Sequence, residues 1–132
     1  MFRSLLRMIN GHRKPLYCES EQDGFRVVIS IGREVRGASD IANLFSSQVA
    51  KIWPDLFSTM KGGFDDYGHS DEFPPAMFFM HVGRTTPDVY MGKESSYHAR
   101  FEFEREKFSH TLPFYDFFLD DNLRTVHHQP VF

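Results

Sequence analysis

The sequence predicts an α+β fold in which an antiparallel sheet of five to six strands packs on one long kinked helix, with a short N-terminal helix. Two patterns lead to this prediction. Residues 41–60 repeat apolar side chains at helical spacing, whereas residues 25–31 and 97–104 alternate them with the period of a strand. A helix with one apolar stripe and strands with one apolar face bury both when they pack as two layers.

The first fourteen residues are expected to form a basic amphipathic arm. Phe2, Leu5, Leu6 and Ile9 fall at i, i+3, i+4 and i+7, which is typical of a short helix, and Gly11 is placed to end it. This arm carries four basic residues and no acid. Its two helical turns are too little for stable membrane attachment, so we treat it as part of a single globular domain spanning 1–132.

A hairpin follows the arm. The segments LYCES (16–20) and FRVVISI (25–31) are rich in strand-forming residues and flank an Asp23-Gly24 pair. Asp-Gly between such runs favours a tight turn, so residues 16–31 are predicted to form two antiparallel strands. Cys18 lies in the first strand, where no neighbour in sequence would activate its thiol, and we interpret it as a packed side chain.

The long helix has the clearest pattern in the chain. Ser39 is predicted to cap it, Asp40 suits its first turn, and Gly62-Gly63 are placed to end it. Pro54 removes one backbone hydrogen bond, so a kink is expected near Ala50–Trp53. One helical stripe contains Ile41, Leu44, Phe45, Gln48, Val49, Ile52, Trp53, Leu56, Phe57 and Met60.

The segment GGFDDYGHSDEFPP (62–75) is predicted to be a long acidic-aromatic loop. Loops of this length are often functional. Its carboxylates do not match the spacing of a calcium-binding loop. Exposed rings beside acids instead favour a protein-contact surface, where rings supply buried area and acids steer a basic partner. The predicted binding residues are Phe64, Asp65, Asp66, Tyr67, Asp71, Glu72 and Phe73.

The C-terminal half is expected to form a meander of strands. AMFFMHV (76–82) is almost wholly apolar and is typical of a central strand covered on both faces, so His81 is expected to be buried. DVYMG (88–92) favours a short strand. In YHARFEFE (97–104) apolar and polar residues alternate, so Tyr97 lies on the apolar face of the predicted strand and His98 on its polar face. Residues 114–121 and 123–132 are predicted to pair through Asp121-Asn122.

The adjacent His127 and His128 invite a reading as a metal site or an acid/base pair. Consecutive side chains of a strand point to opposite faces, so the two rings cannot coordinate the same metal ion. His128 shares a face with Val126 and Pro130, and His127 is expected to be solvated. The chain also lacks an H-E-x-x-H motif and paired cysteines. We therefore predict no metal site, no catalytic residues and no cofactor.

Composition limits the function further. Outside the basic arm, the remaining 118 residues carry 11 basic and 18 acidic groups, a net charge of −7. An acidic body argues against a nucleic-acid partner. No apolar run reaches the length of a membrane span, and a single cysteine fits a reducing compartment, so we expect a cytoplasmic protein.

These observations favour a small non-catalytic domain that binds another protein with a basic surface. A bacterial immunity-type inhibitor or an adaptor would share this physical character. The alternative is a small-ligand-binding or hydrolytic domain with a pocket between helix and sheet. That pocket would be lined by Trp53, His81, Tyr97 and His128, and a core packed with phenylalanine would argue against it.

Overall fold

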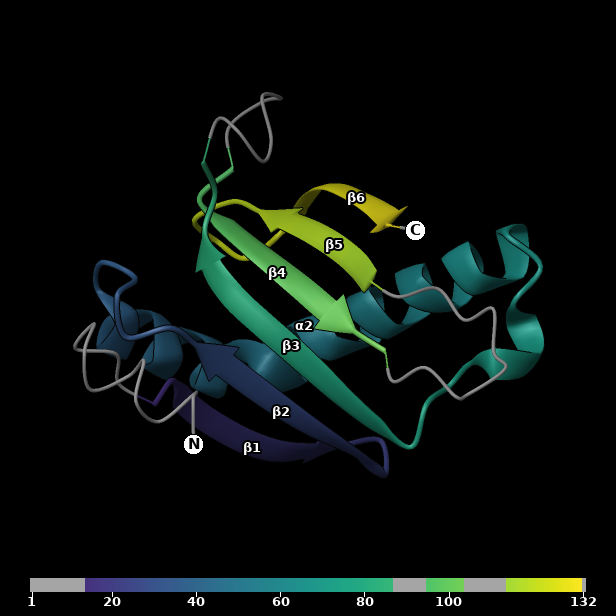
Figure 1. Cartoon of the computed structure of the whole chain (residues 1–132), viewed down its shortest axis with the longest axis horizontal. Coiled ribbons are helices and arrows are strands. Elements are labelled where there is room, and N and C mark those ends of the chain that lie inside the picture. Colours follow the sequence, from purple (N-terminus) through teal and green to yellow (C-terminus); the bar gives the residue numbers. More distant parts are fainter. Residues whose placement is uncertain (1–13, 87–94, 104–113, 132) are drawn as a thin grey trace, which may run out of the picture.

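The computed structural model describes residues 14–86, 95–103 and 114–131, which form one six-stranded sheet with a single long helix on one face (Figure 1). This arrangement confirms the predicted α+β class. The predicted helix at 2–9 and the predicted strand at 88–92 lie outside the described residues. In chain order the elements are β1 (Leu16–Gln22), β2 (Phe25–Ile31), α2 (Ala38–Asp66), the 3-10 helix η1 (Ser70–Glu72), β3 (Met77–Arg84), β4 (Tyr97–Glu102), β5 (Phe114–Leu119) and β6 (Thr125–Val131).

The strands follow one another across the sheet in sequence order, with β1 and β6 at the two edges. The β1–β2 hairpin turns through Asp23 and Gly24, which both have positive φ as a type I′ turn requires. One pair departs from the antiparallel expectation, since β2 and β3 run parallel. The reason lies between them: α2 crosses the back of the sheet and returns the chain to the same end, and a crossover of this kind makes parallel neighbours.

The helix is longer at both ends than its sequence pattern predicts. It begins at Ala38, because Gly37 adopts φ 74° and provides the cap, so Ser39 lies inside the helix without a capping bond. It continues through Pro54, Gly62 and Gly63 to Asp66. The predicted loop at 62–75 is therefore shorter than expected. The kink at Pro54 stays a prediction.

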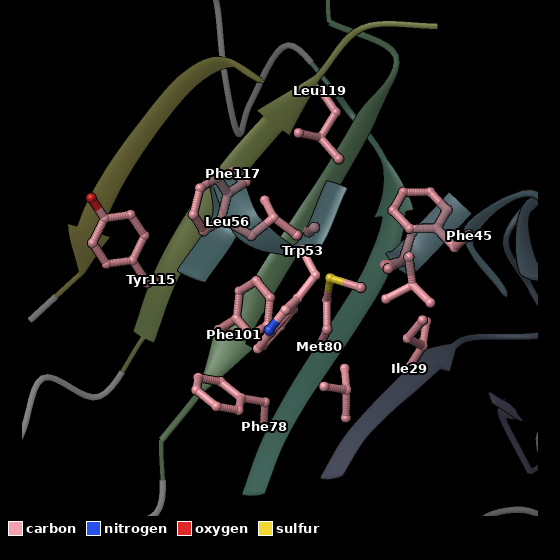
Figure 2. Packing of buried hydrophobic residues seen from close by; sticks show 14 of the residues in the cluster. Ile29, Phe45, Trp53, Leu56, Phe78, Met80, Phe101, Tyr115, Phe117 and Leu119 are labelled. Carbon is pink, nitrogen blue, oxygen red and sulfur yellow. The ribbon is translucent and has the colours of Figure 1, made fainter. Parts of the chain in front are cut away.

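The core lies between α2 and the sheet. Trp53 is fully buried, and its ring centroid lies 4.8 Å from that of Phe78 and 6.2 Å from that of Phe101. Figure 2 shows these rings beside Met80, with Phe117 and Leu119 continuing the same layer. Rings of this size bury roughly 150–250 Å² each, so this cluster supplies much of the driving force for folding. No helix among the described residues is long and apolar enough to cross a membrane.

The helix runs through Gly62-Gly63, and the second glycine lies where the Tyr115 side chain approaches the helix closely. A Cβ atom on Gly63 would lie 2.4 Å from the Tyr115 ring, whereas one on Gly62 would meet nothing within 4 Å. The backbone of α2 therefore packs against the side-chain ring of Tyr115 at this turn, and only a residue without a side chain leaves room for that ring. The Gly62-Gly63 pair is typical of a helix end, but Gly63 is required for packing against Tyr115.

This difference provides a matched pair of substitutions. Gly62→Ala is expected to stabilise the protein by about 0.5–1 kcal/mol, since alanine costs less backbone entropy in an exposed helical position. Gly63→Ala is expected to destabilise it, because the new methyl group collides with Tyr115. Urea unfolding of the two variants measures both signs. A Gly63→Ala variant as stable as Gly62→Ala would show that this close approach is not real.

Candidate functional site

The acidic end of α2 is formed by Asp65, Asp66, Tyr67, Asp71 and Glu72, which lie where the helix passes into η1. Tyr67 follows the last helical residue and is 52% exposed. Asp65, Asp66 and Asp71 are exposed in the same segment. Glu72 is half-buried, and its Oε2 lies 3.3 Å from Nδ1 of His69. The structure therefore brings an exposed ring and several carboxylates to one end of the molecule.

Two of the predicted contact rings are not on this surface. Phe64 is fully buried and Phe73 is 9% exposed, and their ring centroids lie 4.9 Å apart. Phe64 also packs edge-on against Phe103. The expectation that they are exposed is wrong: Phe64 lies on the inner side of a helix that extends to Asp66, and Phe73 follows η1 and packs on Phe57, Phe64 and Phe78. Their role is to anchor the acidic end, while Tyr67 is the aromatic side chain that it displays.

The alternative pocket does not assemble from its four predicted residues. Trp53 lies in the middle of the core, and its indole nitrogen finds no hydrogen-bond acceptor among the described residues. Tyr97 packs edge-on against Phe45 in the same layer. His81 was expected to be buried, but it lies on the opposite face of the sheet, where it is exposed and pairs with Glu102 at 2.9 Å. These three side chains therefore do not converge.

His128, the fourth residue, faces an open groove of about 920 Å³ between α2 and the β5–β6 turn. Gln48, Lys51 and Asp55 line the helical wall, and Arg124 and Thr125 line the other. The Thr125 hydroxyl donates to Asp55 Oδ2 at 3.3 Å, so the two walls touch at one point. A histidine and a carboxylate do share this groove, but it is open to solvent and lies outside the aromatic core.

His127 and His128 lie on opposite faces of β6, as the alternation predicts. His127 is half-buried beside Phe118 on the face away from the helix, so the expectation that it is solvated is wrong. His128 is the more exposed of the two, and its Nδ1 lies 2.8 Å from the Tyr115 hydroxyl. A register shift opposite Leu119 leaves Val126 exposed, so it does not share the inner face with His128.

The surroundings of Tyr115 and His128 shift the pKa values of both side chains. Burial raises the pKa of Tyr115 to about 12, and the nearby Tyr67 and Asp66 add to the effect. Partial burial lowers the pKa of His128, and His127 lowers it further, whereas Asp55 acts in the opposite direction. The neutral imidazole is therefore favoured in the folded state. The unfolded chain takes up this proton first on acidification, so His128 makes the protein less stable as pH falls below its ordinary pKa.

The two charges that act on His128 can be separated by substitution. His127→Gln is expected to raise the pKa of His128, because it removes the like charge, and Asp55→Asn is expected to lower it. An NMR titration of the His128 ring protons measures both changes. Shifts in the same direction for both variants would contradict this assignment.

The sheet face away from the helix contains a buried ion pair that the sequence does not predict. Asp116 on β5 is 2% exposed. Arg100 on β4 donates to both of its oxygens, Nε to Oδ1 at 2.7 Å and the second nitrogen to Oδ2 at 2.8 Å. His98 Nε2 lies 3.0 Å from Oδ1, an ion-pair distance without good hydrogen-bond direction. Rings pack beside this pair, with Phe118 stacked on His98 at 4.8 Å and Phe114 under the guanidinium of Arg100 at 4.7 Å.

Sequence alternation places His98 and Arg100 on one face of a strand and Asp116 on the outer face of another. The sequence pattern does not give the register between β4 and β5, and it is this register that sets Arg100 directly opposite Asp116. Burial acts to raise the pKa of Asp116, but the hydrogen bonds from Arg100 and the contact with His98 outweigh it and hold the pKa below its usual value. This carboxylate therefore stabilises the fold at neutral pH, and its contribution is lost as pH falls below the unfolded-state pKa towards the lower folded value.

Removing the arginine tests this ion pair. Arg100→Leu is expected to destabilise the protein by about 3 kcal/mol, since it leaves a buried carboxylate without its bidentate partner. We take the low end of the range because the Arg100 side chain is 35% exposed. Adding Asp116→Asn to this variant should recover part of the loss. Urea unfolding measures the free energy of unfolding of each variant. If Arg100→Leu alone lowers it by less than about 1 kcal/mol, the ion pair does not contribute substantially to stability.

No group of three or more histidine, cysteine or acidic side chains suited to a metal ion occurs among residues 14–86, 95–103 and 114–131. Comparison of the chain with known protein families, curated proteins and solved structures finds no match.

Proposed function

We propose that this protein is a non-catalytic domain that binds another protein through the acidic end of α2. The observation that carries the proposal is that Tyr67, Asp65, Asp66 and Asp71 are all exposed in the short segment where α2 passes into η1. Beneath them Phe64 and Phe73 are buried. A ring that supplies contact area, carboxylates that supply charge and a rigid base are features of protein-binding surfaces.

The position of these carboxylates supports a role beyond stability. Asp65 and Asp66 occupy the C-terminal end of a helix whose last turn has no basic residue. The helix dipole places partial negative charge there, so each carboxylate costs the fold a few tenths of a kcal/mol, up to about 1. Lys61 lies 3.9 Å from Asp65 but is well exposed, and such a pair offsets little of this cost.

The partner that fits this surface has basic residues around an apolar or aromatic contact. Carboxylates at the rim of an interface act mainly by steering the encounter, and they raise the association rate at low salt. An immunity-type inhibitor of a basic toxin, or an adaptor with a basic partner, would use such a surface, and we place this function in the cytoplasm. The ligand-pocket alternative loses its support, because Trp53 and Tyr97 fill the core and His81 lies on the other face.

A charge-matched pair of variants tests the proposal. The first is the triple change Asp65→Asn, Asp66→Asn and Asp71→Asn. The second removes three exposed acids elsewhere, through Asp23→Asn, Glu34→Gln and Asp55→Asn. Each is used with the wild type to capture partners from native lysate, and association with the captured protein is then measured across salt concentrations. The first variant should associate about tenfold or more slowly at low salt, with a weaker salt dependence.

The second variant is expected to associate nearly as fast as the wild type, since its lost charges lie away from the contact. Equal slowing of both variants would mean that only net charge matters. Unchanged association in the first variant would falsify the proposal that this surface makes the contact.

A further inference from the structure

The two edges of the sheet differ in how well they are protected against pairing with another strand. β6 contains Pro130, which lacks an N–H, and a register irregularity that leaves Val126 out of the ladder. Both are features that interrupt an exposed edge. β1 has neither: all seven of its residues pair in unbroken register with β2, and none is proline. β1 is therefore the edge on which a further strand can be added.

The hairpin determines which backbone groups of β1 point outward. Gln22 and Phe25 flank the two-residue turn and form a hydrogen-bonded pair, and such pairs alternate with non-bonded ones along the ladder. Tyr17, Glu19 and Glu21 therefore direct their N–H and C=O groups away from β2. Since β1 ends the sheet, these groups have no strand partner among the described residues.

The side chains beside this edge indicate what it would bind. Tyr17 is 61% exposed, and Glu19 and Glu21 are exposed on the same face of the sheet. Next to them lies a hollow of about 560 Å³, lined by Tyr17, Glu19, Arg26, Val28, Met77 and Phe79. Arg26 lies opposite Glu21 in the register but forms its ion pair with Glu19, so Glu21 has no salt bridge among the described residues. An added strand would place alternate side chains opposite the two glutamates and beside this apolar hollow.

We propose that the β1 edge binds an extended segment of a partner protein that carries basic residues at alternate positions and an apolar or aromatic side chain for the hollow. Main-chain pairing with Tyr17, Glu19 and Glu21 supplies affinity, and charge complementarity supplies selectivity. This site is separate from the acidic end of α2: in Figure 1 β1 runs along the lower edge of the molecule, and the end of α2 lies at its right margin. The β1 edge would therefore give the proposed protein-binding function a second contact site.

A second copy of this chain fits the edge poorly. In an antiparallel pairing of two β1 strands with the fullest overlap, Glu19 faces Glu19 of the other copy. Like charges directly opposite each other destabilise a strand pair. A segment with lysine or arginine at these positions removes the repulsion and adds attraction.

The test uses a library of random displayed peptides, selected on the whole protein. Selected peptides should be enriched in alternating basic residues, and they should protect the amides of Tyr17, Glu19 and Glu21 from hydrogen exchange. Glu19→Pro removes one outward N–H without touching the β1–β2 ladder, so the fold is expected to persist, as circular dichroism will show. The peptides should bind this variant about tenfold more weakly.

The double change Glu19→Gln and Glu21→Gln tests the charge and decides the matter if Glu19→Pro does not fold. It should also weaken binding, whereas the triple asparagine variant of the acidic end should bind the peptides normally. The inference is overturned by peptides without basic alternation, by equal affinity for wild type and both β1 variants, or by unprotected β1 amides. It is equally overturned if the acidic-end variant abolishes peptide binding, or if the chain dimerises through β1.

Discussion

The burial of one helical stripe against one face of the sheet is the constraint on which the rest of the structure depends. A single helix, α2, crosses the sheet and brings Trp53 against Phe78 and Phe101. Because the chain must cross the sheet before it continues, β3 returns parallel to β2 while every other neighbour pair is antiparallel. The Tyr115 side chain on β5 also packs against the helix backbone, and this is why residue 63 has no room for a side chain.

This arrangement separates the molecule into regions with different roles. The layer between α2 and the sheet is filled with aromatic and aliphatic side chains, so it contributes stability rather than a binding cavity. The opposite face contains the ion pairs His81–Glu102, Arg26–Glu19 and, most buried of all, Arg100–Asp116. The two surfaces that we propose for recognition lie at the margins: the end of α2 with Tyr67, and the regular edge strand β1. Both carry exposed carboxylates, which would complement the basic partners that we propose.

Much of the fold could be predicted because it follows from local pattern. The Asp23-Gly24 turn, the alternation of β4 and the split of His127 from His128 each depend on a few adjacent residues, and each is confirmed. The errors occur where a local signal meets a distant contact. Gly62-Gly63 is typical of a helix end, and only the packing of Tyr115 reveals why the helix continues. Phe64 and Phe73 belong to an acidic segment by sequence, and only the extended helix around Phe64 and the packing of Phe73 on it show that both are buried.

By itself, the sequence determined the fold class, the alternation of faces within each strand and the acidic character of the chain, because these depend on spacing and composition along the chain. Only the tertiary structure decided which face of each strand is covered, which strands are neighbours and in what register. Those facts place Arg100 on Asp116, expose His81 and leave β1 as an open edge. They arise from contacts between residues far apart in sequence, where no local period specifies the partner.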